Sequence, residues 1–177
     1  MNEKNALAAI RATIRDIADF PKPGVVFKDI TPILSNAELL HATIDLLSNR
    51  YRKSRIDQVA AIDARGFLFG AAVADRLGAG LVLIRKQGKL PYRTFDKTYE
   101  LEYGEGTLSM HRDALKQGDR VLIIDDLLAT GGTAAAAAHL VEQGGGQVGE
   151  IEFLVELTFL KGRNRLQGYP VHSVITY

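Results

Sequence analysis

The sequence predicts an α/β fold in which a central, mostly parallel sheet is flanked by helices. Short apolar runs alternate with amphipathic or alanine-rich segments of helical length, and this alternation is typical of parallel strands joined by crossover helices. The runs at residues 59–62, 121–124 and 151–157 are mainly apolar, as strands buried on both faces are. With 177 residues, the chain is expected to form a single domain over 1–177.

The N-terminal region predicts two helices separated by an extended turn. Apolar residues recur at three- and four-residue steps over residues 6–18, which predicts an amphipathic helix. Two prolines and a glycine within residues 21–24 end this helix before a short apolar run at 25–27. A second helix is expected over residues 37–50, with Ser35 or Asn36 as its N-cap.

The rest of the chain supplies the sheet. Between its first strand and the next, residues 67–77 are expected to form a helix that Gly78 ends. The strands are expected at residues 59–62, 81–84, 121–124, 151–157 and, at one edge, 171–175, and a further helix is expected at 133–142.

One segment breaks this alternation. Residues 99–103 and 107–110 alternate polar and apolar side chains on either side of a glycine-containing turn, which predicts a hairpin with both faces partly wet. An insertion of this length in an α/β domain favours a flexible lid, at about residues 87–112, over a core element.

Composition excludes several classes of function. The chain carries 22 lysines and arginines against 21 acidic residues. Its net charge therefore creates no overall positive field that would attract a nucleic acid backbone. It contains no cysteine, which excludes disulfides and thiolate metal sites and predicts a cytoplasmic location. Its four histidines are scattered, and no apolar stretch is long enough for a signal peptide or a membrane span. We therefore expect neither nucleic acid nor membrane as a partner.

The most informative stretch is residues 121–133. Four apolar residues run into Asp125 and Asp126, and a loop of small residues then opens onto a helix. Backbone N–H groups at a helix N-terminus, with the Thr130 and Thr133 hydroxyls beside them, can hold a phosphate dianion. The two carboxylates can accept hydrogen bonds from vicinal hydroxyls, so the stretch predicts a ribose 5-phosphate site. It lacks the order of a Walker loop or of GxGxxG, and the alternative is an ordinary strand-to-helix turn with a capped helix.

A single arginine at the end of a predicted strand offers the complementary charge. Arg65 follows the run at 59–62, precedes Gly66 and could neutralise a bound polyanion. The alternative is a surface arginine in a connecting loop. Arg85, Lys86 and Lys89 likewise form either a solvated basic edge or a second source of charge for phosphates.

Residues 121–133 resemble the phosphoribosyl pyrophosphate (PRPP) binding motif of the type I phosphoribosyltransferases. Residues 19–30, 64–70, 84–91 and 99–104 are similar to signature stretches of the adenine phosphoribosyltransferase family, and the resemblance spans about residues 20–161. It implies that adenine and PRPP give AMP and pyrophosphate, with Mg²⁺, in a homodimer. It also implies a small hood, made of about residues 1–35 with part of the C-terminus, beside the hairpin lid.

The resemblance implies a role for each site residue. The ribose-phosphate group would be bound by Asp125, Asp126, Ala129, Thr130, Gly131, Gly132 and Thr133. Pyrophosphate would be bound by Arg65, Arg85, Lys86 and Lys89, some of them across the dimer, and Arg65 and Lys89 would act in catalysis. Mg²⁺ would be held mainly through PRPP and pyrophosphate, with no direct protein ligand.

The base and the lid complete the implied site. Phe27 and Leu157 would sandwich adenine, while the Val26 carbonyl and the Lys28 amide read its edge. Many relatives have arginine where Lys28 stands, which puts a side-chain role in doubt but not a main-chain role. Glu102 would close over the site as a catalytic proton acceptor or donor, and Tyr103 would shield it from water; by periodicity alone, the glutamate could be a solvated strand charge.

Two other functions fit parts of the pattern. A hypoxanthine, guanine or xanthine enzyme would need a basic residue to read O6, and residues 171–177 contain only His172. A regulator that binds PRPP as a signal would need no catalytic lid. We expect adenine phosphoribosyl transfer because the lid signature is present and no DNA-binding helix-turn-helix is appended.

Overall fold

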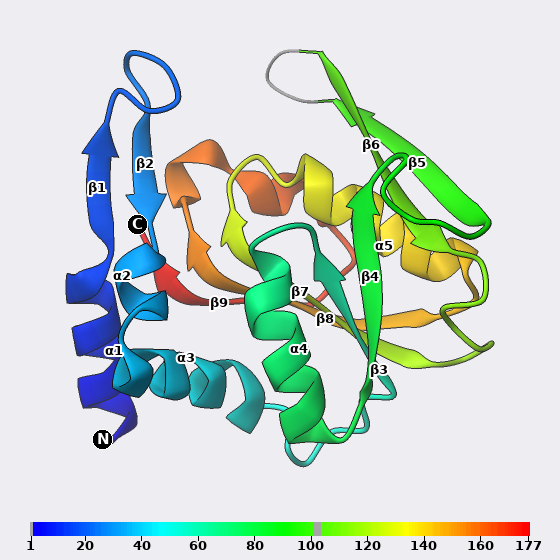
Figure 1. Ribbon diagram of the computed structural model, residues 1–177, viewed down its shortest axis with the longest axis horizontal. Helices are drawn as coiled ribbons and strands as arrows, with labels where there is room; N and C mark the ends of the chain where they lie inside the picture. Colours follow the sequence, from blue (N-terminus) through cyan, green and yellow to red (C-terminus); the bar gives the residue numbers. More distant parts are fainter. Residues whose placement is uncertain (1, 101–103) are drawn as a thin grey trace. The chain divides into compact units, whose positions relative to one another are not determined.

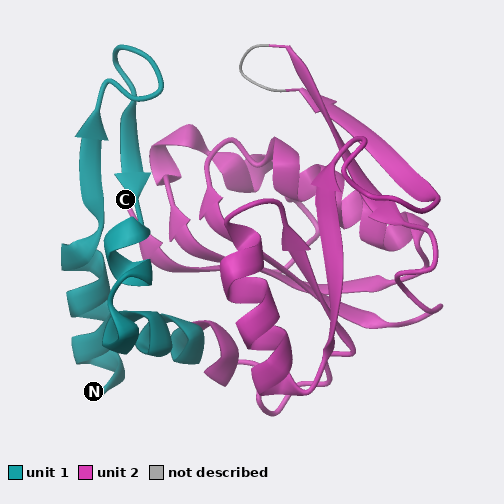
Figure 2. Cartoon of the chain, in the orientation of Figure 1, with its two compact units in different colours: residues 1–46 teal, residues 47–177 magenta. Residues whose placement is uncertain are grey.

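The computed structural model describes residues 2–100 and 104–177. Glu102 and Tyr103, to which the sequence assigns the lid chemistry, lie outside these residues. The chain divides into two compact units, residues 1–46 and 47–177 (Figure 2), and each is described by itself. The prediction of a single domain over the whole chain stays a prediction.

Unit 1 opens with a helix that is shorter than expected. Helix α1 spans Glu3–Thr13, and the Asn2 side chain caps it by accepting a hydrogen bond from the Asn5 amide at 2.8 Å. The prediction of a helix over residues 6–18 is therefore wrong in its last third, because strand β1 occupies Arg15–Ala18. A short helix, α2 at Thr31–Leu34, was not predicted.

Pairing with a second strand, with two ion pairs across it, takes the place of the predicted end of α1. Strand β1 pairs antiparallel with β2, Val26–Asp29, as a separate two-stranded sheet. Arg15 stands opposite Asp29 and forms an ion pair with it at 2.6 Å, and Asp16 stands opposite Lys28, also at 2.6 Å. Opposite charges on facing strand positions favour this pairing over another helical turn.

Helix α3, Ala37–Asn49, matches the prediction closely. Its N-cap is Asn36, whose Oδ1 atom accepts a hydrogen bond from the Leu39 amide at 3.1 Å. Of the two N-cap candidates in the sequence, the structure selects the asparagine.

Unit 2 is built on a seven-stranded sheet that confirms the predicted fold class (Figure 1). Strands β3, β4, β7, β8 and β9 are parallel, whereas β5 and β6 are antiparallel. The spatial order is β5-β6-β4-β3-β7-β8-β9. The strands span Gln58–Ile62 (β3), Gly80–Lys86 (β4), Thr94–Glu100 (β5), Glu105–His111 (β6), Arg120–Leu128 (β7), Gln147–Glu156 (β8) and Val171–Thr176 (β9).

The order of the strands locates the place where a ligand is expected. From β3 the chain first adds β4 on one side and later adds β7 on the other side. The neighbours β3 and β7 therefore form a topological switch point, where the connections diverge and leave a crevice at the carboxyl ends of the strands.

Two helices cover opposite faces of this sheet (Figure 1). Helix α4, Gly66–Leu77, packs on the face that carries Ala61, and it ends as predicted at Gly78, whose φ of 64° is left-handed. Helix α5, Gly132–Gln143, packs on the face of Ala60 and Ile62. Its alanines are mostly buried and let it lie close to the strands, so they serve packing as well as helix propensity. The connecting turns η1, Thr158–Leu160, and η2, Gly162–Arg165, follow β8.

The predicted hairpin is present, but it belongs to the sheet. Strands β5 and β6 pair antiparallel from Thr94 opposite His111 to Glu100 opposite Glu105. Strand β6 also pairs with β4, and its residues Leu108, Ser109 and Met110 are buried. The expectation that both faces of the hairpin are partly exposed to water is therefore wrong for this part of β6, because pairing with β4 makes these residues part of the core.

A buried carboxylate connects β8 with the edge strand β9. Glu152 is fully buried, accepts a hydrogen bond from the Tyr51 hydroxyl, and lies 3.0 Å from Nδ1 of His172. Burial raises the pKa of Glu152, and the hydrogen bond to Glu152 raises the pKa of His172. Arg50 and Glu150, an ion pair at 3.0 Å, are the other charges that act on this histidine.

We expect His172→Gln to destabilise the protein more at pH 6 than at pH 9. A histidine whose folded pKa is raised above its unfolded value of 6.5 stabilises the fold fully below that value. This stabilisation is lost as the pH rises through the raised pKa. Because the His172 side chain is 36% exposed, we expect a loss of only about 1 kcal/mol at pH 6.

Thermal unfolding at both pH values measures the effect of His172→Gln. The matched control is His139→Gln, since His139 is exposed on α5. An equal shift in Tm at pH 6 and pH 9 would contradict the pH dependence expected for His172.

Candidate active site

Strand β7 carries the two adjacent carboxylates within its ladder. It extends to Leu128, whereas the sequence pattern predicted an end at residue 124. Asp125 stands opposite Phe153 and Leu128 opposite Glu156 on β8. Charge ends the apolar pattern but not the backbone pairing, so the strand continues through both aspartates.

The two carboxylates are held in different ways. Asp126 is only 4% exposed, and its Oδ2 atom lies 2.9 Å from Nε of Arg65. Asp125 accepts a hydrogen bond from the Asp126 amide through Oδ1 at 2.9 Å. Burial raises the pKa of Asp125 well above its usual value, and the Asp126 charge raises it further. Burial also raises the pKa of Asp126, although the Arg65 guanidinium opposes that shift.

A glycine lets Arg65 reach these carboxylates. Arg65 precedes Gly66, the first residue of α4. A Cβ atom on Gly66 would lie 2.8 Å from the Ile124 carbonyl oxygen and 3.0 Å from Oδ1 of Asp125. Only a glycine therefore allows the start of α4 to approach β7 this closely.

A cavity of about 340 Å³ opens where β3 and β7 end. Its size is that of a small-molecule site. The predicted site residues Arg65, Lys86, Asp125, Asp126 and Thr133 line it together, and the other lining residues are Ile62, Asp63, Ala64, Tyr99, Leu108 and Leu127. The structure thus brings acidic groups suited to hydroxyls next to cations suited to phosphates.

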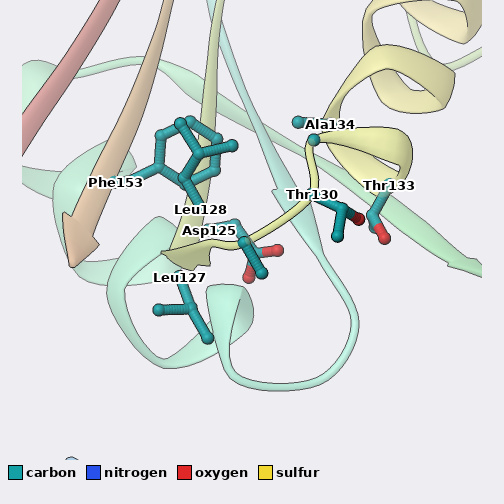
Figure 3. Close-up of a pocket in the computed structure, with 9 residues that line it drawn as sticks. Asp125, Leu127, Leu128, Thr130, Thr133, Ala134 and Phe153 are labelled. Atoms are coloured by element: carbon teal, nitrogen blue, oxygen red, sulfur yellow. The ribbon is translucent and has the colours of Figure 1, made fainter. Parts of the chain in front are cut away.

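A smaller cavity, of about 70 Å³, lies over the loop before α5. The predicted residues Ala129, Thr130, Gly131 and Thr133 line it, together with Asp125, Leu127, Leu128, Ala134 and Phe153. Figure 3 shows the side chains of Thr130 and Thr133 beside each other where the loop enters the helix. Gly131 has a φ of 83°, and Gly132 is the first helical residue. The first N–H groups of a helix have no intrahelical acceptor, so this loop and helix start can receive a phosphate.

The basic residues after β4 are placed unequally. Lys86 lines the larger cavity. Nε of Arg85 lies 3.1 Å from Oδ2 of Asp63, and its Nη1 donates to the Lys89 carbonyl oxygen at 3.0 Å. Arg85 and Lys89 are not among the residues that line the two cavities described here, so their pyrophosphate role stays a prediction.

The residues predicted to bind the base belong to both units. Val26, Phe27 and Lys28 lie on β2 in unit 1, where Lys28 Nζ pairs with Asp16. In unit 2, Leu157 follows β8 directly and is 7% exposed. The base-binding role of these four residues stays a prediction.

The structure adds residues that sequence reasoning missed. Asp63, Tyr99 and Leu127 line the larger cavity, and Phe153 lines the smaller one. Asp63 had a signal, because it is an acidic residue directly after a predicted strand. Tyr99 and Phe153 had none, since their positions depend on the pairing of β5 with β6 and of β8 with β7.

Over residues 2–100 and 104–177, no group of three or more His, Cys, Asp or Glu side chains could hold a metal ion. In the same part of the chain, no helix is both long and apolar enough to cross a membrane.

Comparisons with known proteins agree on one family. Residues 29–173 match the family model described as "Phosphoribosyl transferase domain". The adenine phosphoribosyltransferase of Syntrophotalea carbinolica is 55% identical over 168 residues, which cover 95% of this chain and 98% of the relative.

Solved structures lead to the same group of proteins. The crystal structure of adenine phosphoribosyltransferase from Thermoanaerobacter pseudethanolicus is 53% identical with a TM-score of 0.94, covering 97% of this chain and 99% of that one. The Saccharomyces cerevisiae enzyme, solved with adenine and an imino-altritol bisphosphate, is 38% identical with a TM-score of 0.91, at 97% and 99% coverage.

Proposed function

Because the chain belongs to the adenine phosphoribosyltransferase family, we propose that it converts adenine and PRPP to AMP and pyrophosphate. This is a pentosyltransferase reaction of purine salvage. The observation that carries the proposal is the 340 Å³ cavity at the ends of β3 and β7, where Asp125 and Asp126 face Arg65 and Lys86. A substrate with a diol at one place and phosphates on either side requires this combination of groups.

The sugar and its 5-phosphate bind along β7 and the start of α5. The Asp125 and Asp126 carboxylates accept hydrogen bonds from the ribose hydroxyls, and hydrogen bonds to charged groups are the stronger ones. The 5-phosphate lies on the amides of residues 129–133 and on the Thr130 and Thr133 hydroxyls. The smaller cavity over this loop supports that placement.

The reaction breaks the bond between C1 of the ribose and pyrophosphate and forms a bond from C1 to a purine nitrogen. Positive charge develops on the sugar and negative charge on the departing pyrophosphate. Arg65 and Lys86 line the cavity and stabilise the leaving group, which preorganised cations do without reorganisation. Arg85 and Lys89 add charge at the same end, some of it across the subunit boundary.

The base binds between Phe27 and Leu157, and main-chain groups of Val26 and Lys28 read its edge. The pairing of Lys28 Nζ with Asp16 fits a main-chain role for this lysine. Glu102 exchanges the proton of the purine ring, and Tyr103 excludes water. Both residues lie beyond Glu100, the last residue of β5, whose neighbour Tyr99 lines the cavity.

Mg²⁺ is proposed to enter with the substrate. The ion commonly binds through one or two carboxylates, several waters and substrate phosphates, and it needs no dedicated cage of three protein groups. Because Asp125 and Asp126 are assigned to the ribose hydroxyls, the PRPP phosphates and water would supply the oxygen ligands of the ion. When bound, the ion screens the phosphate charge of PRPP and makes pyrophosphate a better leaving group.

A homodimer is proposed from an exposed apolar face of unit 2. Leu81 and Leu83 lie on one face of β4 and remain 40% and 39% exposed, and Leu68 on α4 is 49% exposed. Exposed leucines on neighbouring elements are typical of an interface. Sedimentation at micromolar concentration should give twice the chain mass of 19.4 kDa, and a monomer would contradict the proposal.

A steady-state assay tests the function. We expect adenine consumption that requires both PRPP and Mg²⁺, with hypoxanthine and guanine used far less well. The His172 side chain bonds to Glu152, so the basic group of residues 171–177 is already engaged and is a poor reader of O6. Preference for a 6-oxopurine, or PRPP binding without pyrophosphate release, would contradict the proposal. The cytoplasmic location stays a prediction.

A further inference from the structure

The loop that receives the phosphate is in close backbone contact with a distant part of the chain. A Cβ atom on Gly131 would lie 2.3 Å from the Gly162 carbonyl oxygen. Conversely, a Cβ atom on Gly162 would lie 2.3 Å from the Ala129 carbonyl oxygen and 2.9 Å from Cδ1 of Leu128. Two glycines thus let two peptide backbones touch where any side chain would force them apart.

We call residues 158–165 the brace segment. It supports the loop from outside, because its residues are not among those that line the two described cavities. At its start, the Leu157 amide donates to the Leu128 carbonyl oxygen at 2.9 Å. The brace segment, which follows β8, therefore begins beside the end of β7 from which the phosphate loop departs.

An arginine fixes the brace segment to the sheet. Arg163 donates from Nε to Oε1 of Glu156 at 2.8 Å and from Nη2 to Oε2 at 2.7 Å. Its Nη1 donates to the Val171 carbonyl oxygen at 2.9 Å. The Glu156 side chain is 4% exposed, and the hydrogen bonds from Arg163 lower its pKa. A two-point bond to a buried carboxylate holds the preceding residue in the chain, Gly162, in one position.

We propose that Gly162 and Arg163 are positioning residues for the ribose-phosphate half of the substrate. Arg163, held by Glu156, keeps the Gly162 peptide against residues 129–131 and so maintains the loop conformation that binds the 5-phosphate. This inference rests on the proposed function. It concerns residues that do not touch the substrate and act only through the loop.

The test compares binding of ribose 5-phosphate with use of adenine. The methyl group added in Gly162→Ala must displace the Ala129 carbonyl, because the backbone fixes the position of a Cβ atom and the methyl cannot rotate away. We expect the dissociation constant for ribose 5-phosphate, measured by titration calorimetry, to rise about tenfold, since small displacements of positioning groups cost one to two orders of magnitude. The KM for adenine at saturating PRPP should change less than twofold.

Two matched controls isolate the brace. Gly149→Ala places a methyl 3.1 Å from Nε of the Arg120 side chain and should leave ribose 5-phosphate binding unchanged. Arg50→Gln removes an Arg–Glu pair on the same strand, β8, at Glu150, and should also leave it unchanged. Arg163→Lys keeps the charge but not the two-point bond, and it should weaken ribose 5-phosphate about threefold or more.

The outcomes separate the brace from the function itself. The positioning role of the brace segment is overturned if folded Gly162→Ala protein binds ribose 5-phosphate as tightly as the wild type does. The same role is overturned if the dissociation constant for ribose 5-phosphate and the KM for adenine rise by the same factor. If Gly162→Ala does not fold, Arg163→Lys decides, and unchanged binding by that variant overturns the inference. Wild-type protein that fails to bind ribose 5-phosphate overturns the inference, whereas wild-type protein that releases no pyrophosphate from PRPP and adenine contradicts the proposed function.

Discussion

Arg65→Gln should lower kcat/KM for PRPP about a hundred- to a thousandfold, the loss typical when one preorganised stabilising group is removed from an active site. Arg65 lines the cavity and lies 2.9 Å from Asp126. Its loss removes positive charge from the departing pyrophosphate. It also leaves the buried Asp126 carboxylate without its nearest cation, which raises the pKa of that group further.

Steady-state kinetics with varied PRPP measure this effect. Arg65→Lys should fall between the wild type and Arg65→Gln, because lysine keeps the charge but loses the planar donor geometry. The matched control is Arg55→Gln, which removes an exposed Arg–Asp pair, at 2.9 Å from Asp57, before the opposite end of β3. A folded Arg65→Gln enzyme with more than a third of wild-type kcat/KM would exclude Arg65 from the chemistry.

Glu102→Leu should lower kcat about a hundredfold, the usual contribution of a positioned general acid or base. The KM for PRPP should change less than threefold, because the proposed PRPP site consists of groups of β7 and α5. Glu102→Gln separates proton transfer from hydrogen bonding, since it keeps the size of the side chain and removes the carboxylate.

Glu100→Leu is the control for the Glu102 variants. Glu100 lies two residues earlier, its side chain is 81% exposed, and its contact with Arg165 is a loose one of 3.8 Å. Its replacement should leave kcat within twofold of the wild type. An unchanged kcat in Glu102→Leu would assign the proton transfer to another group or to water.

Local patterns locate the five parallel strands of unit 2 because each contains a short apolar run, although β7 and β8 extend beyond those runs. The strand at residues 59–62 and the helix ended by Gly78 follow from the run of apolar residues and from the left-handed glycine. The end of α1 could not be predicted, because Ile14 and Ile17 keep a helical spacing. The residues after the helix pair with β2 instead, and periodicity in residues 6–18 does not reveal that partner.

The same distinction holds for the candidate site. Asp125, Asp126 and the loop before α5 were predictable, because carboxylates, threonines and glycines follow one another along the chain. Tyr99 and Phe153 reach the cavities through strand pairing, so no local pattern identifies them. The close approach of Gly131 and Gly162 joins positions about thirty residues apart, and only the folded chain reveals it.

The two adjacent aspartates of β7 lower the stability of the folded protein. Both pKa values are raised in the folded state, so ionising them opposes folding as the pH rises from the unfolded value of 3.8 through the raised values. Pairing with β8 continues through this part of β7 and holds its backbone in place, so the two charges cannot move far apart. At these two positions, selection for stability and selection for turnover therefore act in opposite directions, and a more stable variant gained there would be a poorer enzyme.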